Sequence, residues 1–143
     1  MGKIKHIAIA TQDPDKAAQF YIDVFGLKQI TKINSPGATG YMLSDGDINM
    51  ALLKFKNDQV TGVPEGKEYK GLHHIGSEVE KLEDTAKKME SANAPIRDDI
   101  NQVFGVGMDK PRHVNVEVKF GGPNGVIIDV SETGWASTAR HPH

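Results

Sequence analysis

The sequence contains no cysteine, few aromatic residues and no long hydrophobic run, and each absence excludes a class of protein. Without cysteine there can be no disulfide, thiolate nucleophile or cysteine-ligated zinc, so a metal must be held by histidine, carboxylate or backbone oxygen. The apolar stretches are far shorter than the roughly 20 residues that span a bilayer. The net charge is −2 with both signs interspersed, so no basic stripe suits nucleic acid or an anionic membrane.

A length of 143 residues and a hydrophobic fraction of 38% are ordinary for one globular domain with its own core. The amino terminus reads Met-Gly-Lys-Ile-Lys-His and lacks the apolar centre of a secretory leader. We therefore expect a cytoplasmic protein that acts on a small molecule, with neither nucleic acid nor membrane as partner.

An internal repeat organises the chain. The segment Lys5-His6-Ile7-Ala8 has a counterpart in His73-His74-Ile75-Gly76, and each begins a strand that leads into a helix. In the first half Asp13 is a good N-cap, Pro14 suits the first helical position and Gly26 ends the helix. In the second half, apolar residues recur at helical spacing from Leu82 to Met89.

Three strand-like runs follow each helix, so each half reads strand–helix–strand–strand–strand. The runs are 28–33, 39–43 and 48–55 in the first half, and 96–103, 113–120 and 125–131 in the second. The sequence thus predicts an α+β fold in which two tandem βαβββ modules form a curved mixed sheet around a metal-containing cleft. The predicted modules span 3–56 and 72–133, with a linker at 57–71 and a loose tail at 134–143.

Three residues with metal-ligand chemistry occupy matching places in this pattern. Asp129 is a lone carboxylate in the apolar run Gly-Val-Ile-Ile-Asp-Val-Ser, where it is costly unless it is paired or bound to a cation. His6 and His74 stand at equivalent places on the first strands of the two halves. The repeat therefore makes these three residues candidates for one site.

The residues 5–27 and 122–132 resemble the opening segment and the closing hairpin of the vicinal-oxygen-chelate superfamily, which includes glyoxalases, bleomycin-resistance proteins and extradiol dioxygenases. The resemblance covers residues 3 to about 135. It implies that His6, His74 and Asp129 hold one divalent metal, with the shorter Asp where the family usually has Glu. Two imidazoles and one carboxylate form an open triad that favours Fe(II), although Mn(II), Zn(II) or Ni(II) also fit.

The resemblance also distinguishes between reaction types. Ala51 aligns with Asp129 in the repeat, where glyoxalases and acyl-CoA epimerases of this superfamily place a Glu as metal ligand or base. Extradiol dioxygenases leave that position unused and carry a proton-shuttling His before the closing hairpin, for which His113 is the candidate catalytic residue. We therefore favour a dioxygenase-type oxidoreductase that chelates a substrate through two vicinal oxygens.

Further residues are candidates for the site on weaker grounds. Tyr41 on an inner strand, Asn115 on the face of His113, and Arg112 as a carboxylate partner are candidate substrate-binding residues. Glu117 shares the same face and is either a base or part of a solvated strand edge. His73 is expected to point to the opposite face from its neighbour.

Other functions stay open. A glyoxalase-like lyase or isomerase, or a thiol transferase of the fosfomycin-resistance type, needs the same metal ligands. A non-catalytic small-molecule binding protein of this superfamily usually lacks the ligand histidines. By resemblance we also expect a homodimer.

Overall fold

The computed structural model describes residues 2–111 and 115–139. Its elements follow a βα-repeat along the chain, with short 3-10 turns before β5 and β7. They are β1 (Lys3–Ala10), α1 (Pro14–Phe25), β2 (Lys28–Asn34), β3 (Ala38–Ser44), β4 (Asn49–Phe55), η1 (Gly66–Glu68), β5 (Gly71–Glu78), α2 (Leu82–Ser91), α3 (Asp98–Phe104), β6 (Val118–Gly121), η2 (Pro123–Gly125) and β7 (Ile127–Ser131).

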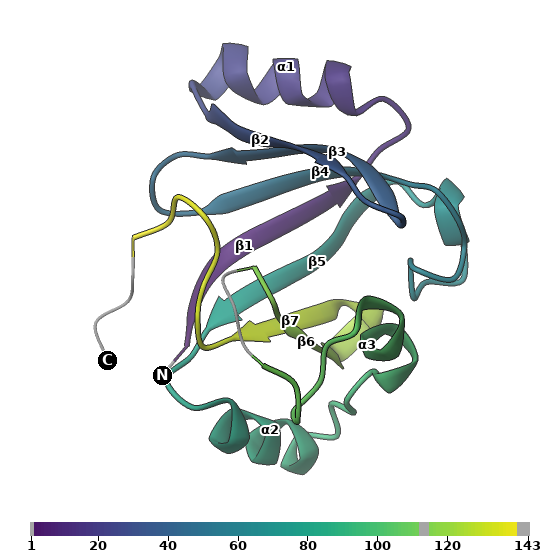
Figure 1. The fold of residues 1–143 in the computed structure, drawn as a ribbon, viewed down its shortest axis with the longest axis vertical. Helices are drawn as coiled ribbons and strands as arrows, with labels where there is room; N and C mark the ends of the chain where they lie inside the picture. Colours follow the sequence, from purple (N-terminus) through teal and green to yellow (C-terminus); the bar gives the residue numbers. More distant parts are fainter. Residues whose placement is uncertain (1, 112–114, 140–143) are drawn as a thin grey trace.

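The strands form one open mixed sheet in the order β2-β3-β4-β1-β5-β7-β6, which confirms the predicted α+β fold (Figure 1). The first strand of each half pairs in parallel with the last strand of the same half, β1 with β4 and β5 with β7. The two halves are joined by the antiparallel pair β1–β5 at the centre. Among the described residues no helix is long and apolar enough to cross a bilayer.

Successive side chains along each strand point to opposite faces of the sheet. One face is covered by helices, and the other face, which we call the cavity face, borders the cavity described below. Helix α1 begins at Pro14, where Asp13 accepts a hydrogen bond from the backbone of Lys16, and it packs on Leu43 and Leu52. Helix α2 covers the other end of the sheet (Figure 1). There one apolar cluster contains Val79, Leu82, Val118, Phe120 and Val130. The residues between these core positions therefore face the opposite side of the sheet.

The expected strand at 96–103 is wrong, because this segment forms α3 and the second half therefore has one strand fewer than the first. Two acidic residues occupy the first turn of α3, and Gly105 ends it in a left-handed conformation with φ 66°. The Asn101 side chain then binds the backbone of Lys119, accepting from its N–H (2.9 Å) and donating to its carbonyl (3.2 Å). The edge of β6 is thus satisfied by a short backbone bridge at Ile96 and by the side-chain amide of Asn101, and no full strand pairs there.

The expected strand at 113–120 is also shorter in the structure, where β6 begins at Val118. Asn115 has φ 68°, a left-handed backbone that does not fit a strand. Its side chain accepts a hydrogen bond from the backbone of Ala136 at 2.9 Å. Residues 115–117 therefore form an irregular segment at the cavity before the chain enters the sheet.

The segment 132–139, which includes part of the expected loose tail, crosses back over the sheet from β7 towards β3 and β4 (Figure 1). Ser44 donates a side-chain hydrogen bond to the carbonyl of Ser137 (2.7 Å), and Ala139 donates to the carbonyl of Gly46 (3.1 Å). We call residues 132–139 the C-terminal strap. These long-range hydrogen bonds fix a segment whose sequence has no strand or helix periodicity.

Trp135 anchors the strap above a glycine. Gly76 pairs with His6 on one side and with Asp129 on the other. A Cβ atom at Gly76 would lie 2.5 Å from the Trp135 ring and 2.9 Å from the Cβ of His6. The missing side chain therefore makes the space in which the Trp135 ring lies parallel to His6, with centroids 5.1 Å apart.

We expect Gly76→Ala to lower the free energy of unfolding by about 1–3 kcal/mol, because the added methyl overpacks the contact between Trp135 and His6. Chemical denaturation followed by circular dichroism measures this change. Gly107→Ala is the control, since its nearest contact is the side chain of Asp109 at 3.2 Å in an exposed turn. Equal stability of the two variants would contradict the packing role of Gly76.

Candidate metal centre

Three buried side chains from three central strands converge on the cavity face. His6 comes from β1, His74 from β5 and Asp129 from β7, and each is at most 6% exposed. One ligand atom from each lies within 4.8 Å of the others. His74 Nε2 is 3.1 Å from His6 Nε2 and 3.2 Å from Asp129 Oδ2. The structure thus brings together the three residues that the repeat singled out.

Hydrogen bonds on the far side of His6 fix its tautomer. Asn49 donates through Nδ2 to the carbonyl of Ala136 (3.0 Å), which turns its Oδ1 towards His6 Nδ1 at 2.8 Å. An amide oxygen only accepts, so His6 must donate from Nδ1. Its Nε2 therefore carries a free lone pair that faces the centre.

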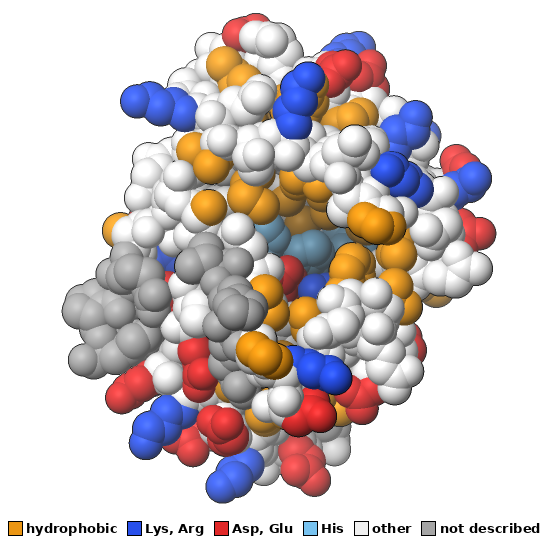
Figure 2. All heavy atoms as spheres, viewed as in Figure 1, with side chains coloured by type: hydrophobic (Ala, Val, Ile, Leu, Met, Phe, Trp, Pro, Cys, Tyr) orange, Lys and Arg blue, Asp and Glu red, His pale blue; other side chains and the backbone are white. Residues whose placement is uncertain are grey.

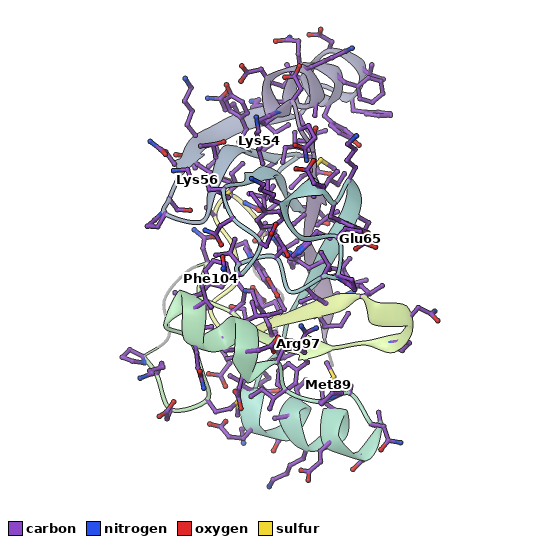
Figure 3. The ribbon with its side chains drawn as sticks, turned by 90° about the vertical axis from the view of Figure 1, so that its right-hand side faces the viewer. Lys54, Lys56, Glu65, Met89, Arg97 and Phe104 are labelled. Carbon is purple, nitrogen blue, oxygen red and sulfur yellow. The ribbon has the colours of Figure 1, made fainter. Side chains whose placement is uncertain are left out.

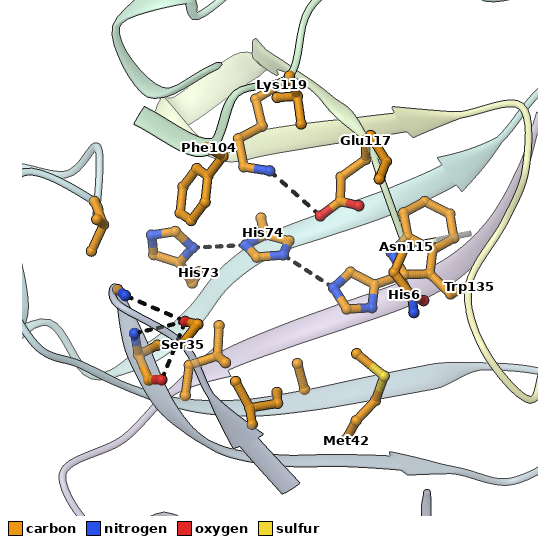
Figure 4. A pocket seen from close by; sticks show the side chains of 18 of the residues that line it. His6, Ser35, Met42, His73, His74, Phe104, Asn115, Glu117, Lys119 and Trp135 are labelled. Carbon is orange, nitrogen blue, oxygen red and sulfur yellow. Dashed lines mark hydrogen bonds and ion pairs between the residues drawn. The ribbon is translucent and has the colours of Figure 1, made fainter. Parts of the chain in front are cut away.

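A series of hydrogen bonds through His73 fixes the tautomer of His74 (Figure 4). His73 Nε2 lies 2.6 Å from the carbonyl of Thr61 and must donate to it. Burial lowers the pKa of His73, so its Nδ1 is an acceptor near neutral pH, 2.8 Å from His74 Nδ1. His74 donates there and keeps an unprotonated Nε2. The expectation that His73 points away from its neighbour is wrong, because the two rings are in contact.

The geometry therefore turns three electron-pair donors towards one point. Burial lowers the pKa of His6 and lowers that of His74 strongly, although Asp129 opposes both shifts. Burial also opposes ionisation of Asp129, but His74 and Lys119 hold the pKa of that carboxyl below its usual value. Neither Asp129 oxygen has a hydrogen-bond partner among the described residues. Two imidazole lone pairs and an ionised carboxylate, whose charge Lys119 balances in part, are turned towards one point, and this donor set fits a divalent metal.

Glu117 and Lys119 extend the site on the side of β6 (Figure 4). Lys119 Nζ is 3.5 Å from both Asp129 Oδ2 and Glu117 Oε1. Burial favours a neutral amine, but Asp129 and Glu117 outweigh it and raise the pKa of Lys119. Burial, with a contribution from Asp129 and against the charge of Lys119, raises the pKa of Glu117 to about 8. The site therefore holds a cation and a carboxyl group that exchanges its proton near neutral pH.

A cavity of about 450 Å³ opens above these groups. Figure 2 shows histidine side chains at the bottom of a hollow that hydrophobic side chains surround. Its walls are mainly apolar and include Ile33, Met42, Leu53, Phe55, Val60, Phe104, Val106 and Val116. A cavity of this size suits a small-molecule ligand with a polar end and an apolar body.

The structure places the other predicted site residues in different parts of the molecule. Asn115 lines the cavity, as expected. Tyr41 does not, because β3 alternates and Met42 faces the cavity while Tyr41 packs with α1 and donates a hydrogen bond to Asp15. Arg112 and His113 lie outside the described residues. The strand position of Ala51, aligned with Asp129, is buried on the cavity wall.

Sequence reasoning underrated several residues of the site. Glu117 was expected to be either a base or part of a solvated strand edge, and Lys119 was given no role. Both alternate with Val118, and that alternation was the available signal that they share the face of the cavity. Nothing in the sequence pointed to Asn49 or to the stacking of Trp135 on His6, since each depends on the C-terminal strap.

We expect Asp129→Asn to weaken metal binding by more than the roughly 100-fold that follows loss of an outer partner of a ligand. The amide keeps the size but removes the charge that the cation requires. Trp135 is the only tryptophan and stacks on His6, so quenching of its fluorescence by Co(II) measures binding directly. Asp47→Asn, whose side chain is 67% exposed, is the control. Undiminished Co(II) binding in D129N would contradict the assignment.

The hydrogen bonds from His74 through His73 to Thr61 lead to a second prediction about metal affinity. His73→Leu removes the acceptor for His74 Nδ1, and we expect metal affinity to fall about 10- to 100-fold. His73→Asn places an amide oxygen near the former Nδ1 but loses the contact with Thr61, so its affinity should lie closer to that of the wild type. Metal titration of both variants, followed by Trp135 fluorescence, checks the order. The same affinity in H73L and wild type would show that His73 does not orient the ligand.

Comparisons with known proteins point to isomerases. The chain is 28% identical over 86 residues to the mitochondrial methylmalonyl-CoA epimerase of Mus musculus, a match that covers 57% of this chain and 48% of the relative. The corresponding epimerase of Homo sapiens is 29% identical over 86 residues, with 57% and 49% covered. The chain thus spans about half the length of the curated relatives it matches.

Solved structures share the fold. A methylmalonyl-CoA epimerase in complex with methylmalonyl-CoA and NH4+ superposes with a TM-score of 0.67 at 18% identity, covering 95% of this chain and 96% of the other. A variant of the Streptomyces coelicolor methylmalonyl-CoA epimerase gives 0.66 at 21% identity, with 94% and 97% covered.

These findings correct the predicted reaction. The dioxygenase interpretation is wrong, since the named relatives are epimerases and therefore isomerases, not oxidoreductases. The preference for Fe(II), which came from the triad of two imidazoles and one carboxylate, stays a prediction. The error came from Ala51, whose missing carboxylate was taken as evidence against proton transfer, although a second carboxyl group reaches the site from Glu117.

The resemblance of the two terminal segments is confirmed over the full fold. The family model described as "Glyoxalase/Bleomycin resistance protein/Dioxygenase superfamily" matches residues 3–130. This match includes both histidines, the closing carboxylate and every strand of the sheet. The chain belongs to the Glyoxalase/Bleomycin resistance protein/Dioxygenase superfamily.

Proposed function

We propose that the protein is a metal-dependent isomerase that moves a proton on a carbon atom next to a carbonyl group. His6, His74 and Asp129 would hold one divalent metal, and the observation that carries this is the convergence of their unprotonated ligand atoms within 4.8 Å. A bound metal would act as a Lewis acid on two adjacent substrate oxygens and make the neighbouring C–H group more acidic. The curated relatives, named as epimerases, support this type of reaction.

The protein's own residues would handle the proton. The Glu117 carboxyl lines the cavity beside Asn115 and Lys119 on the approach to the metal ligands. In its ionised form it would take the proton from the substrate carbon, leaving the electron pair on the enolate. A proton delivered to the opposite face of that carbon would complete the isomerisation, Glu117 would release its own proton to solvent, and no oxidant or reductant is required. The absence of a carboxylate at Ala51 then does not prevent the reaction, because the proton acceptor would come from the other half of the chain, just before β6.

The charges of the site favour an anionic substrate. Asp129 balances part of the charge of a divalent cation, but Lys119 lies 3.5 Å from that carboxylate and offsets it. The centre therefore keeps a positive charge in a cavity with mainly apolar walls. A carboxylic acid or its thioester, with two oxygens close enough to chelate, meets this requirement. Arg112 and His113 remain candidate substrate and proton-transfer residues, and the homodimer stays a prediction.

Deuterium exchange tests the reaction directly. Metal-loaded protein in D2O with methylmalonyl-CoA as the probe should exchange the hydrogen on the carbon between the two carbonyl groups, as observed by NMR. We expect Glu117→Gln to slow this exchange about 100- to 10,000-fold, since the amide cannot accept the proton. Metal content of the variant should match that of the wild type.

Glu65→Gln is the control, because Glu65 is exposed and does not line the cavity. Undiminished exchange in E117Q would remove Glu117 from the reaction. Absence of exchange in the wild type with both methylmalonyl-CoA and short 2-oxo acids would overturn the isomerase proposal.

A further inference from the structure

A second pocket adjoins the metal cavity. This outer pocket has a volume of about 550 Å³ and shares four residues with the inner cavity. The shared residues are Ser35, Gly37, Val60 and Phe104. The two hollows are therefore neighbours, and these four residues form the wall that they have in common.

The outer pocket is uncharged and partly apolar. None of the described residues that line it carries a charge. They are Ser35, Pro36, Gly37, Asn57, Gln59, Val60, Val103 and Phe104. Val103 and Phe104 are 49% and 44% exposed although both are large and apolar. Exposed apolar side chains gathered at the entrance of a ligand cavity indicate a surface that a ligand covers.

Phe104 lies at the boundary between the metal cavity and the outer pocket. Lys119 Nζ lies 5.1 Å from the centre of its ring, and the same ring borders the outer pocket. Figure 3 shows Phe104 at the end of α3 away from Arg97. Helix α3 has no counterpart in the first half, so Phe104 is supplied by the element that replaces the expected strand.

We propose that the outer pocket binds an uncharged chain of the substrate whose chelating, anionic end lies at the metal centre, so that Phe104 selects acids with an extended chain. This inference rests on the proposed function, because it takes the metal centre as the site of the anionic end. The apolar side chains of Val60, Val103 and Phe104 favour a hydrocarbon chain. A pantetheine arm is also uncharged, and the experiment distinguishes the two sources.

The test is a titration of metal-loaded full-length protein with 2-oxo carboxylates from pyruvate to 2-oxooctanoate, measured by calorimetry. Each member offers the same two adjacent oxygens and differs only in its chain. Affinity should rise about threefold to fourfold for each methylene that enters the outer pocket. Phe104→Ala should weaken 2-oxooctanoate binding about 10-fold and change pyruvate binding less than twofold, on the order of one aromatic contact.

Phe20→Ala provides the matched control, since Phe20 is 52% exposed on α1, far from the cavity lining. Pyruvate that binds with the same affinity as 2-oxooctanoate would overturn this inference and leave the proposed function intact. If F104A lost the same factor in affinity for every 2-oxo carboxylate from pyruvate to 2-oxooctanoate, that result would also overturn the inference. If no member binds in a metal-dependent manner, this inference fails, while deuterium exchange with methylmalonyl-CoA decides the proposed function separately. The same comparison is made with a pantetheine thioester of methylmalonate. If Phe104→Ala weakens binding of this thioester more than binding of 2-oxooctanoate, the assignment of the pocket to a hydrocarbon chain is overturned.

Discussion

The site depends on one electrostatic constraint, the approach of two unprotonated imidazole nitrogens to a buried carboxylate. His6 Nε2 and His74 Nε2 are 3.1 Å apart, and Asp129 is fully buried beside them. The outer hydrogen bonds decide this arrangement. The carbonyls of Thr61 and Ala136 only accept, and each fixes the direction of a chain of donors that ends at a ligand ring. The cost of turning lone pairs towards one another is offset only when a cation lies between them.

The packing that supports this centre comes from the C-terminal strap. Trp135 lies on His6 because Gly76 has no side chain, and Ala136 orients the amide of Asn49. A segment outside the sheet thus holds the ligand of the central strand β1 from two directions. Its bonds to the loop after β3 connect the two halves of the molecule, and rigid support of this kind is what a preorganised metal centre requires.

The chemistry of the cavity follows from where the charges lie. Lys119 is buried between two carboxyl groups and keeps the site electropositive when a divalent metal is bound. The proposed proton acceptor, Glu117, lies just before β6, whereas the internal repeat suggested β4. The comparison of Ala51 with Asp129 was sound as an alignment of the two halves, but it considered only symmetry-related positions. Proton transfer needs a carboxyl group at the cavity, whichever strand provides it.

Sequence alone determined the ligand trio and the order of the first half, because strand period, helix caps and an internal repeat are local signals. Only the tertiary structure decided that 96–103 folds as a helix, since the Asn101 amide satisfies the edge of β6 across 18 residues. It also turned Tyr41 towards α1 and brought His73 and Trp135 to the ligand rings. These outcomes depend on contacts between distant segments, which periodicity does not encode. The trio was therefore predictable, whereas its tautomers, its supporting shell and its proton acceptor were not.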